Sequence, residues 1–196
     1  MDASLRVDKE LVTLTNIFWR HATGQSFEHC QFDLGEEVSI SGEIVGNLQG
    51  MWGALTYEIL CWPDCSTRLV RGRVQHQDGV STWLMSRDLG GIWLVNGEPH
   101  FSLDSCQDVD IGVTPSTNTL PIRRLGLHVG AAVACSSAWL RFPDLTVHAL
   151  PQRYTRLSSD VYRYESLSSG FQTTLQVDKQ GIVQEYHGLW TRLFID

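Results

Sequence analysis

The sequence predicts a mainly β protein built on a long antiparallel sheet. Two observations carry this prediction. Apolar and polar side chains alternate with a period of two over much of the chain, and turn residues recur about every 8–12 residues, as in antiparallel all-β domains. Successive side chains of a strand point to opposite faces, so each alternating segment is expected to bury one face.

The clearest alternation lies in residues 37–46, where Val38 and Ile40 point to one face and Ser39 and Ser41 point to the other. A strand of this kind has one face in the core and the other in water. Further strands are expected at residues 54–60, 68–77, 80–86, 161–167, 171–177 and 182–194.

A two-residue hairpin turn is predicted at Asn96-Gly97, between the apolar segments 90–95 and 98–103. Both residues accept the positive φ of a type I′ turn, which joins antiparallel strands. No change in composition, long Pro/Gly linker or low-complexity tract divides the chain. We therefore expect a single domain over residues 1–196.

Two segments have helical features. In residues 8–19 several apolar side chains have helical spacing, although their β-branched neighbours disfavour a helix. In residues 117–126, Asn118 or Thr119 is a suitable N-cap, and Pro121 falls where its missing N–H costs nothing. The glycine at the end of this segment is suited to terminate a short helix.

Charge and composition exclude several classes of partner. The 196 residues carry a formal net charge of −7, with no cluster of Lys or Arg. Nucleic acids and anionic membrane surfaces attract concentrated positive charge, so neither is an expected partner. No stretch approaches the roughly 20 apolar residues of a membrane-spanning helix, so stable membrane insertion is not expected.

The N-terminal segment and the cysteines indicate a cytoplasmic protein. Charged residues interrupt the apolar run of residues 1–19, which therefore lacks the hydrophobic region of a secretory signal. The five cysteines are odd in number and scattered, which favours reduced thiols. Cys61 and Cys65 have a spacing that zinc ligands use, but no second pair follows, so we expect no metal site. No motif indicates a cofactor.

Residues 108–125 hold the densest group of polar side chains. On a strand, Asp108 and Asp110 would point the same way, about 6–7 Å apart, and each would raise the pKa of the other unless cations or hydrogen-bond donors relieve the repulsion. Arg123 and Arg124 diverge on a helix, so one is expected to pair with the aspartates while the other reaches solvent or a partner. Two interpretations remain open, a structural ion network and a recessed site for sugar hydroxyls.

Much of the chain resembles the Putative glycolipid-binding family, a bacterial family first catalogued as a domain of unknown function. The resemblance is carried by residues 42–46 (GEIVG), 57–59 (YEI), 67–70 (TRLV), 91–98 (GIWLVNGE), 103–127, 142–157 and 177–194. The most specific motifs are TNTLPIRRL from Thr117 and QRYTRL from Gln152. Ser116 departs from the pattern, because an aromatic residue is expected after the Thr-Pro pair.

The resemblance implies that the sheet is curled into an open roll around a single short helix, similar to lipoprotein-carrier proteins. The enclosed helix would then be residues 117–126. The resemblance also implies a tight homodimer and an acidic pocket. The expected ligand-binding residues are Asp108, Asp110, Asn118, Arg123, Arg124, Gln152, Tyr154 and Trp93.

These features together predict non-catalytic binding or carriage of a glycolipid-like amphiphile, with its sugar head group in the acidic pocket. Gln152 and Tyr154 would line the pocket from one strand face, and Trp93 would stack on a sugar ring. One alternative is a glycosidase that uses Asp108 and Asp110, whose separation touches the range of about 6.5–9.5 Å found in inverting enzymes. Their approach from the same side argues against this alternative. A dimeric structural protein without a ligand is the other.

Overall fold

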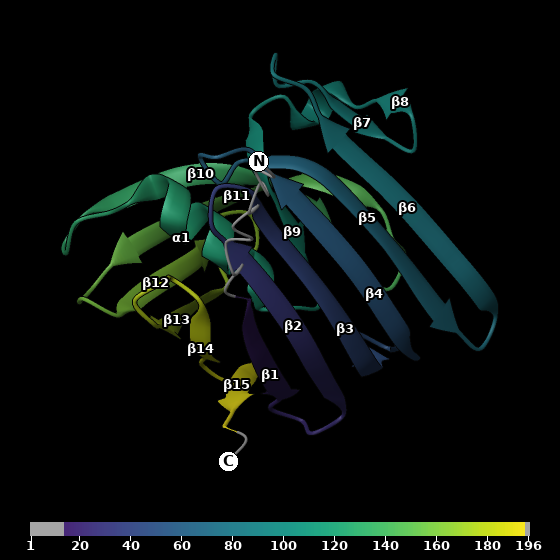
Figure 1. Cartoon of the computed structure of the whole chain (residues 1–196), viewed down its shortest axis with the longest axis horizontal. Helices are drawn as coiled ribbons and strands as arrows, with labels where there is room; N and C mark the ends of the chain where they lie inside the picture. Colours follow the sequence, from purple (N-terminus) through teal and green to yellow (C-terminus); the bar gives the residue numbers. More distant parts are fainter. Residues whose placement is uncertain (1–13, 195–196) are drawn as a thin grey trace, which may run out of the picture.

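The structure is a computed structural model, and it describes residues 14–194 (Figure 1). The strands are β1 (Thr15–His21), β2 (Ser26–Leu34), β3 (Val38–Leu48), β4 (Met51–Cys61), β5 (Thr67–His76), β6 (Gly79–Arg87), β7 (Trp93–Val95), β8 (Glu98–Pro99), β9 (Cys106–Ile111), β10 (Ala132–Leu140), β11 (Val147–Arg156), β12 (Val161–Ser166), β13 (Gln172–Val177), β14 (Val183–Tyr186) and β15 (Trp190–Leu193). The helices are the 3₁₀ turns η1 (Phe101–Leu103) and η2 (Ser116–Asn118) and the α-helix α1 (Thr119–Leu125).

All fifteen strands form one sheet, in the spatial order β8-β7-β6-β5-β4-β3-β2-β1-β15-β14-β13-β12-β11-β10-β9. Neighbouring strands are antiparallel, except that β9 and β10 are parallel. The strands predicted from period-two alternation are confirmed as β3–β6 and β12–β15. The predicted hairpin is also confirmed, because Asn96 and Gly97 have φ values of 51° and 89° and join β7 to β8.

The sheet curls until β9, at one edge, lies against β5 in the opposite half of the sheet. β9 pairs with β10 at one edge of the sheet, yet the backbone N–H of Val109 donates to Oγ1 of Thr67 in β5 at 2.9 Å. Nε2 of Gln49, in the turn between β3 and β4, donates to O of Gly112 at 2.7 Å. Figure 1 shows the long strands β2–β6 as one wall and β10–β13 as the other. The predicted open roll is confirmed, since the edge strands β8 and β9 do not pair with each other.

The roll encloses η2 and α1. The first four residues of α1 are buried, and Gly126 ends the helix in the left-handed conformation with φ 52°. The predicted helix is therefore confirmed, with a 3₁₀ turn as its first part. Asn118 makes no capping bond to the helix, because its side chain is bonded to Tyr154 and Pro115 instead.

The helix predicted in residues 8–19 is wrong where the structure describes it, while residues 8–13 lie outside the described part. Thr15–His21 forms β1, paired with β2 and β15. Ile17 and Trp19 are fully buried, and Phe18 between them is stacked on His29. Here a period-two pattern of large apolar residues outweighs the helical spacing.

We expect Thr67→Val to destabilise the roll, because the N–H of Val109 would be left buried without an acceptor. The free energy of unfolding in urea should fall by roughly 1–3 kcal/mol, since the side chains have similar shape and only the hydroxyl is lost. The control Thr82→Val changes an exposed residue of β6 and should alter stability by less than about 0.5 kcal/mol. Equal effects of the two substitutions would contradict this role for Thr67.

Candidate functional site

A cavity of about 250 Å³ lies where β9 ends and η2 begins. Asp110, Thr114 and Asn118 line its polar side. The remaining wall is rich in aromatic rings and hydroxyl groups, from Trp139, Tyr164, Ser166, Ser168, Ser169, Phe171, Tyr186 and Trp190. A second hollow of about 200 Å³ shares Gln49, Gly112 and Trp190 with this cavity, so the two adjoin.

Asp110 presents a partly buried carboxylate to this cavity. Nε2 of Gln152 in β11 donates to its Oδ2 at 2.6 Å and to Oη of Tyr164 at 3.1 Å. Oγ of Ser137 donates to Oε1 of Gln152 at 3.0 Å, which fixes the orientation of the amide. Burial raises the pKa of Asp110 to about 6, and the hydrogen bond from Gln152 opposes this rise. At neutral pH Asp110 is therefore ionised and can accept further hydrogen bonds.

Asn118 is held in the same cavity by Tyr154. Oη of Tyr154 donates to Oδ1 of Asn118 at 2.9 Å, and Nδ2 of Asn118 donates to O of Pro115 at 3.3 Å. Tyr154 is only 1% exposed. It therefore acts on the cavity by orienting Asn118.

Asp108 forms a separate buried ion pair with Arg124. Nε and Nη2 of Arg124 donate to Oδ1 and Oδ2 of Asp108 at 3.0 and 2.6 Å. The predicted pairing of one arginine with an aspartate is confirmed, and it ties the last turn of α1 to β9. The donors expected to relieve a repulsion between the aspartates are present, because Arg124 donates to Asp108 and Gln152 donates to Asp110. Burial is the main cause of the raised pKa at both, and Arg124 opposes it at Asp108.

The other predicted residues lie away from this cavity. Arg123 donates from Nη1 to O of Gln180 at 2.9 Å and, with Arg124, lines a different cleft. Trp93 is fully buried, and its Nε1 donates to O of Cys106 at 3.0 Å. The structure brings together four of the eight predicted residues, namely Asp110, Asn118, Gln152 and Tyr154.

A closed ring of hydrogen bonds lies behind the cavity wall and contains a buried carboxyl group. Glu28 in β2 is 2% exposed, and Oη of Tyr57 donates to its Oε1 at 2.5 Å. Oγ1 of Thr114 lies 2.7 and 2.8 Å from its two carboxyl oxygens. Oγ of Ser116 lies 2.7 Å from Oη of Tyr57 and 2.9 Å from Oγ1 of Thr114, which closes the ring.

The ring is complete when Glu28 is neutral. Four neighbouring pairs form the ring, namely Glu28–Tyr57, Tyr57–Ser116, Ser116–Thr114 and Thr114–Glu28. The three hydroxyl groups supply three protons, so the fourth pair is hydrogen-bonded only when the carboxyl group is protonated. Burial raises the pKa of Glu28 to about 8, against the opposing hydrogen bonds of Tyr57 and Thr114. At neutral pH the protonated ring thus ties β2 and β4 to the segment that leads into η2.

Gly42 makes room for this ring. It pairs with Tyr57 across β3 and β4, and a Cβ at Gly42 would clash with the ring and hydroxyl group of Tyr57. Glu28 was not among the predicted site residues. The available signal is that Glu28 shares one face of β2 with Cys30 and Phe32, both fully buried. An acidic residue on the apolar face of a strand indicates a buried carboxyl group.

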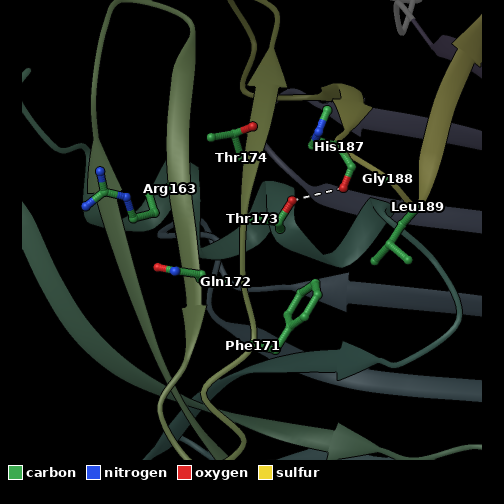
Figure 2. Close-up of a pocket in the computed structure, with 8 residues that line it drawn as sticks. All are labelled: Arg163, Phe171, Gln172, Thr173, Thr174, His187, Gly188 and Leu189. Carbon is green, nitrogen blue, oxygen red and sulfur yellow. Dashed lines mark hydrogen bonds between the residues drawn. The ribbon is translucent and has the colours of Figure 1, made fainter.

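A broader hollow of about 690 Å³ lies beside the cavity, on β12, β13 and the turn before β15 (Figure 2). Phe171 and Leu189 line both this hollow and the cavity. Oγ1 of Thr173 donates to O of His187 at 3.0 Å, which holds the turn against β13 (Figure 2). The polar cavity is therefore adjacent to partly apolar surface.

Metal ligands, reactive thiols and membrane-spanning helices are further possible features of residues 14–194. No three or more His, Cys, Asp or Glu side chains of residues 14–194 are grouped to hold a metal ion. All five cysteines are free, and burial raises the pKa of Cys106 to about 11, which disfavours a nucleophilic thiolate. No helix within residues 14–194 has the length and apolar character needed to cross a membrane.

Comparison with known proteins is consistent with this architecture. Residues 16–192 match the family described as Putative glycolipid-binding. The crystal structure of a DUF1089 family protein from Pseudomonas aeruginosa is similar, with a TM-score of 0.77 and 33% sequence identity. The similarity covers 86% of this chain and 92% of that chain. No curated protein matches the sequence significantly.

We expect Glu28→Gln to flatten the pH dependence of stability. Folded Glu28 has a pKa of about 8, against 4.5 as its ordinary value, so the unfolded chain loses this proton first as pH rises. The free energy of unfolding should therefore fall by up to about 1.4 kcal/mol per pH unit between these values and level off above pH 8. Glutamine still offers a donor and an acceptor to the ring, so the variant should fold without this slope.

Urea unfolding at several pH values between 6 and 8 measures this slope. In this range Asp110, with a pKa of about 6, contributes less to the pH dependence of stability. Glu43→Gln is the matched control, because Glu43 is exposed on β3, and it should keep the wild-type slope. A Glu28→Gln variant with an unchanged slope would show that Glu28 is ionised in the folded protein.

Proposed function

Since the chain belongs to the Putative glycolipid-binding family, we propose that it is a non-catalytic binding or carrier protein for a glycolipid-like amphiphile. The sugar head group would be held in the cavity beside Asp110. The observation that supports this site is that one cavity combines a carboxylate, an amide and several aromatic rings. Carboxylate and amide groups match the donors and acceptors of sugar hydroxyls, and aromatic faces offer flat apolar surface to a sugar ring.

The proposed roles divide between contact and positioning residues. Asp110 and Asn118 line the cavity and would bond the hydroxyl groups of the sugar. Trp139 and Tyr186 would supply ring faces. Gln152 would orient the Asp110 carboxylate through its hydrogen bond of 2.6 Å, and so would not need to contact the ligand itself.

The lipid part of the ligand would lie outside the core of the roll. The largest fully buried side chains, which include Trp19, Phe32 and Trp93, fill that core. The hollow lined by Phe171 and Leu189 adjoins the cavity, and Phe171 is 42% exposed. Each methylene buried there would contribute about 0.8 kcal/mol, so even partial coverage of the chain would add affinity.

The arrangement of carboxyl groups favours binding over hydrolysis. A glycosidase of the usual kind needs two carboxyl groups that flank the scissile bond. Asp108 is fully buried in its bidentate pair with Arg124. Glu28 is engaged in the hydrogen-bonded ring. Asp110 is therefore the one carboxylate that the proposal assigns to ligand contact.

Asp110→Asn should weaken binding of octyl glycosides by about tenfold, because charge-assisted hydrogen bonds are roughly twice as strong as neutral ones. Quenching of tryptophan fluorescence below the micellar concentration would measure this, since Trp139 and Trp190 line the cavity. Asp78→Asn, in the turn between β5 and β6, is the control and should bind like the wild type. Equal affinity of the two variants would remove Asp110 from the site. Absence of binding by the wild type to every glycoside and glycolipid tested would overturn the carrier function.

The proposal also includes a cytoplasmic homodimer, and the outer face of the sheet offers a surface for it. Phe27 pairs with Val45 across β2 and β3, and both are exposed, by 50% and 62%. Trp52 in β4 is 58% exposed. Apolar side chains in such a row are typical of protein–protein interfaces. The free cysteines are compatible with a reducing compartment.

Val45→Lys should dissociate this dimer, because it places a charge in the apolar row without disturbing the core. Sedimentation velocity at micromolar concentrations should show a dimer for the wild type and a monomer for the variant. Val129→Lys, at a position 60% exposed before β10, should remain dimeric. A monomeric wild type, or a dimeric Val45→Lys variant, would refute this interface.

A further inference from the structure

A cleft of about 790 Å³ collects cationic side chains at the C-terminal end of α1. Arg123 and Arg124 come from the last turn of α1, Arg156 from β11, and Lys179 from the turn between β13 and β14. The sugar cavity lies at the other end of this segment, beside Asn118. We propose that the cleft is a second binding site, for the phosphate group of an organic phosphate ester.

Three of the four cations of this cleft have no ion pair within residues 14–194. Among residues 14–194, Arg124 pairs with Asp108, whereas Arg123, Arg156 and Lys179 have no ion pair. The whole chain has a formal net charge of −7. Three unpaired cations around one cleft therefore run against the overall composition, and an anionic ligand would neutralise them.

Two carboxylates line the cleft, but local turns already use both. Oδ1 of Asp64 accepts hydrogen bonds from the backbone N–H and the hydroxyl of Ser66, at 2.9 and 2.7 Å. Oδ1 of Asp178 accepts from the backbone N–H groups of Gln180 and Ile182, at 2.9 and 3.0 Å. These bonds hold the carboxylates to their own turns, which leaves the cationic groups available.

The four cations differ in how many donors they have left. Arg156 donates from Nε, Nη1 and Nη2 to three backbone carbonyls and so shapes the cleft. Arg124 directs Nε and Nη2 to Asp108. Arg123 donates from Nη1 to Gln180, and its Nε is buried without a partner among the described residues. That Nε is out of reach of a ligand, whereas Nη2 of Arg123 makes no hydrogen bond among residues 14–194 and can donate to a bound oxyanion.

The donors match a phosphate group better than a carboxylate. A guanidinium group offers a planar fork of N–H donors, and an ammonium group offers a compact charge with three donors. A phosphate ester has several oxygens that can accept from both at once. The cleft is also much larger than a bare ion, which leaves room for the organic part of the ligand. That part could be a soluble sugar or glycerol ester or the head group of a phospholipid.

The double variant Arg123→Gln/Lys179→Gln tests the proposal. Calorimetric titration with sn-glycerol 3-phosphate should show binding to the wild type and a loss of at least about tenfold in affinity for the variant. The matched control is Arg20→Gln/Arg73→Gln, which removes the same charge from exposed positions on β1 and β5. The control should bind like the wild type, and so should Asp110→Asn, because the sugar cavity is a separate site.

Cosedimentation with vesicles distinguishes the two sources of the phosphate group. Binding to phosphatidylglycerol vesicles but not to phosphatidylcholine vesicles or the free ester would identify a lipid head group. Lys179→Gln alone supplies the folding control, since Lys179 is exposed, and it should weaken binding without lowering the unfolding temperature. The proposal is overturned if neither probe binds the wild type, or if the Arg20/Arg73 control loses as much affinity as the double variant.

Discussion

Within residues 14–194 the fifteen-stranded sheet has one short α-helix and no second layer over its inner face, so it covers that face with its own chain. The segment from β9 through α1 meets this requirement. Val109 and Ile111 of β9 are buried, and the N–H of Val109 bonds to Thr67 in β5, the fourth strand from the opposite edge of the sheet. The curl of the sheet and the enclosure of this segment therefore depend on each other, because the burial of apolar side chains drives both.

The enclosed segment carries polar groups into the core, where each needs a partner. Two buried carboxyl groups anchor this segment. Glu28 bonds to Thr114 before η2, and Asp108 bonds to Arg124 in the last turn of α1. The two carboxyl groups differ in charge because their partners differ. Glu28 meets hydroxyl groups, which cannot compensate a buried charge, and its pKa rises to about 8. Asp108 meets the Arg124 guanidinium, which opposes the effect of burial and forms a bidentate pair. Neutral and ionic anchors therefore fix the same short segment, and each has a hollow next to it.

The sequence predicts the parts of this architecture that depend on local order. Alternation of apolar and polar residues identifies strands with one buried face. Pro121 near the start and Gly126 after the end identify α1. Alternation does not identify β1, whose large apolar residues also fit a helical spacing. The site divides in the same way. Asp110 and Asn118 lie within one motif, whereas Glu28 and Thr114 are 86 positions apart. Only the curl of the sheet brings that pair together, and residue spacing does not determine the curl.

The enclosed helix α1 separates the two hollows that line the ends of this segment. The cavity beside Asp110 and the cleft beside Arg123 lie at opposite ends of α1. The seven residues of α1 span about 10 Å at 1.5 Å per residue. Leu120 and Ile122 are buried along this length and pack with the strands. A ligand cannot extend from one hollow to the other through that packing without displacing the helix. The two hollows also differ in chemistry, since one offers a carboxylate and aromatic rings and the other offers unpaired cations. The two proposed ligands, a hydroxyl-rich group at one end of the helix and an anionic group at the other, would therefore occupy separate sites.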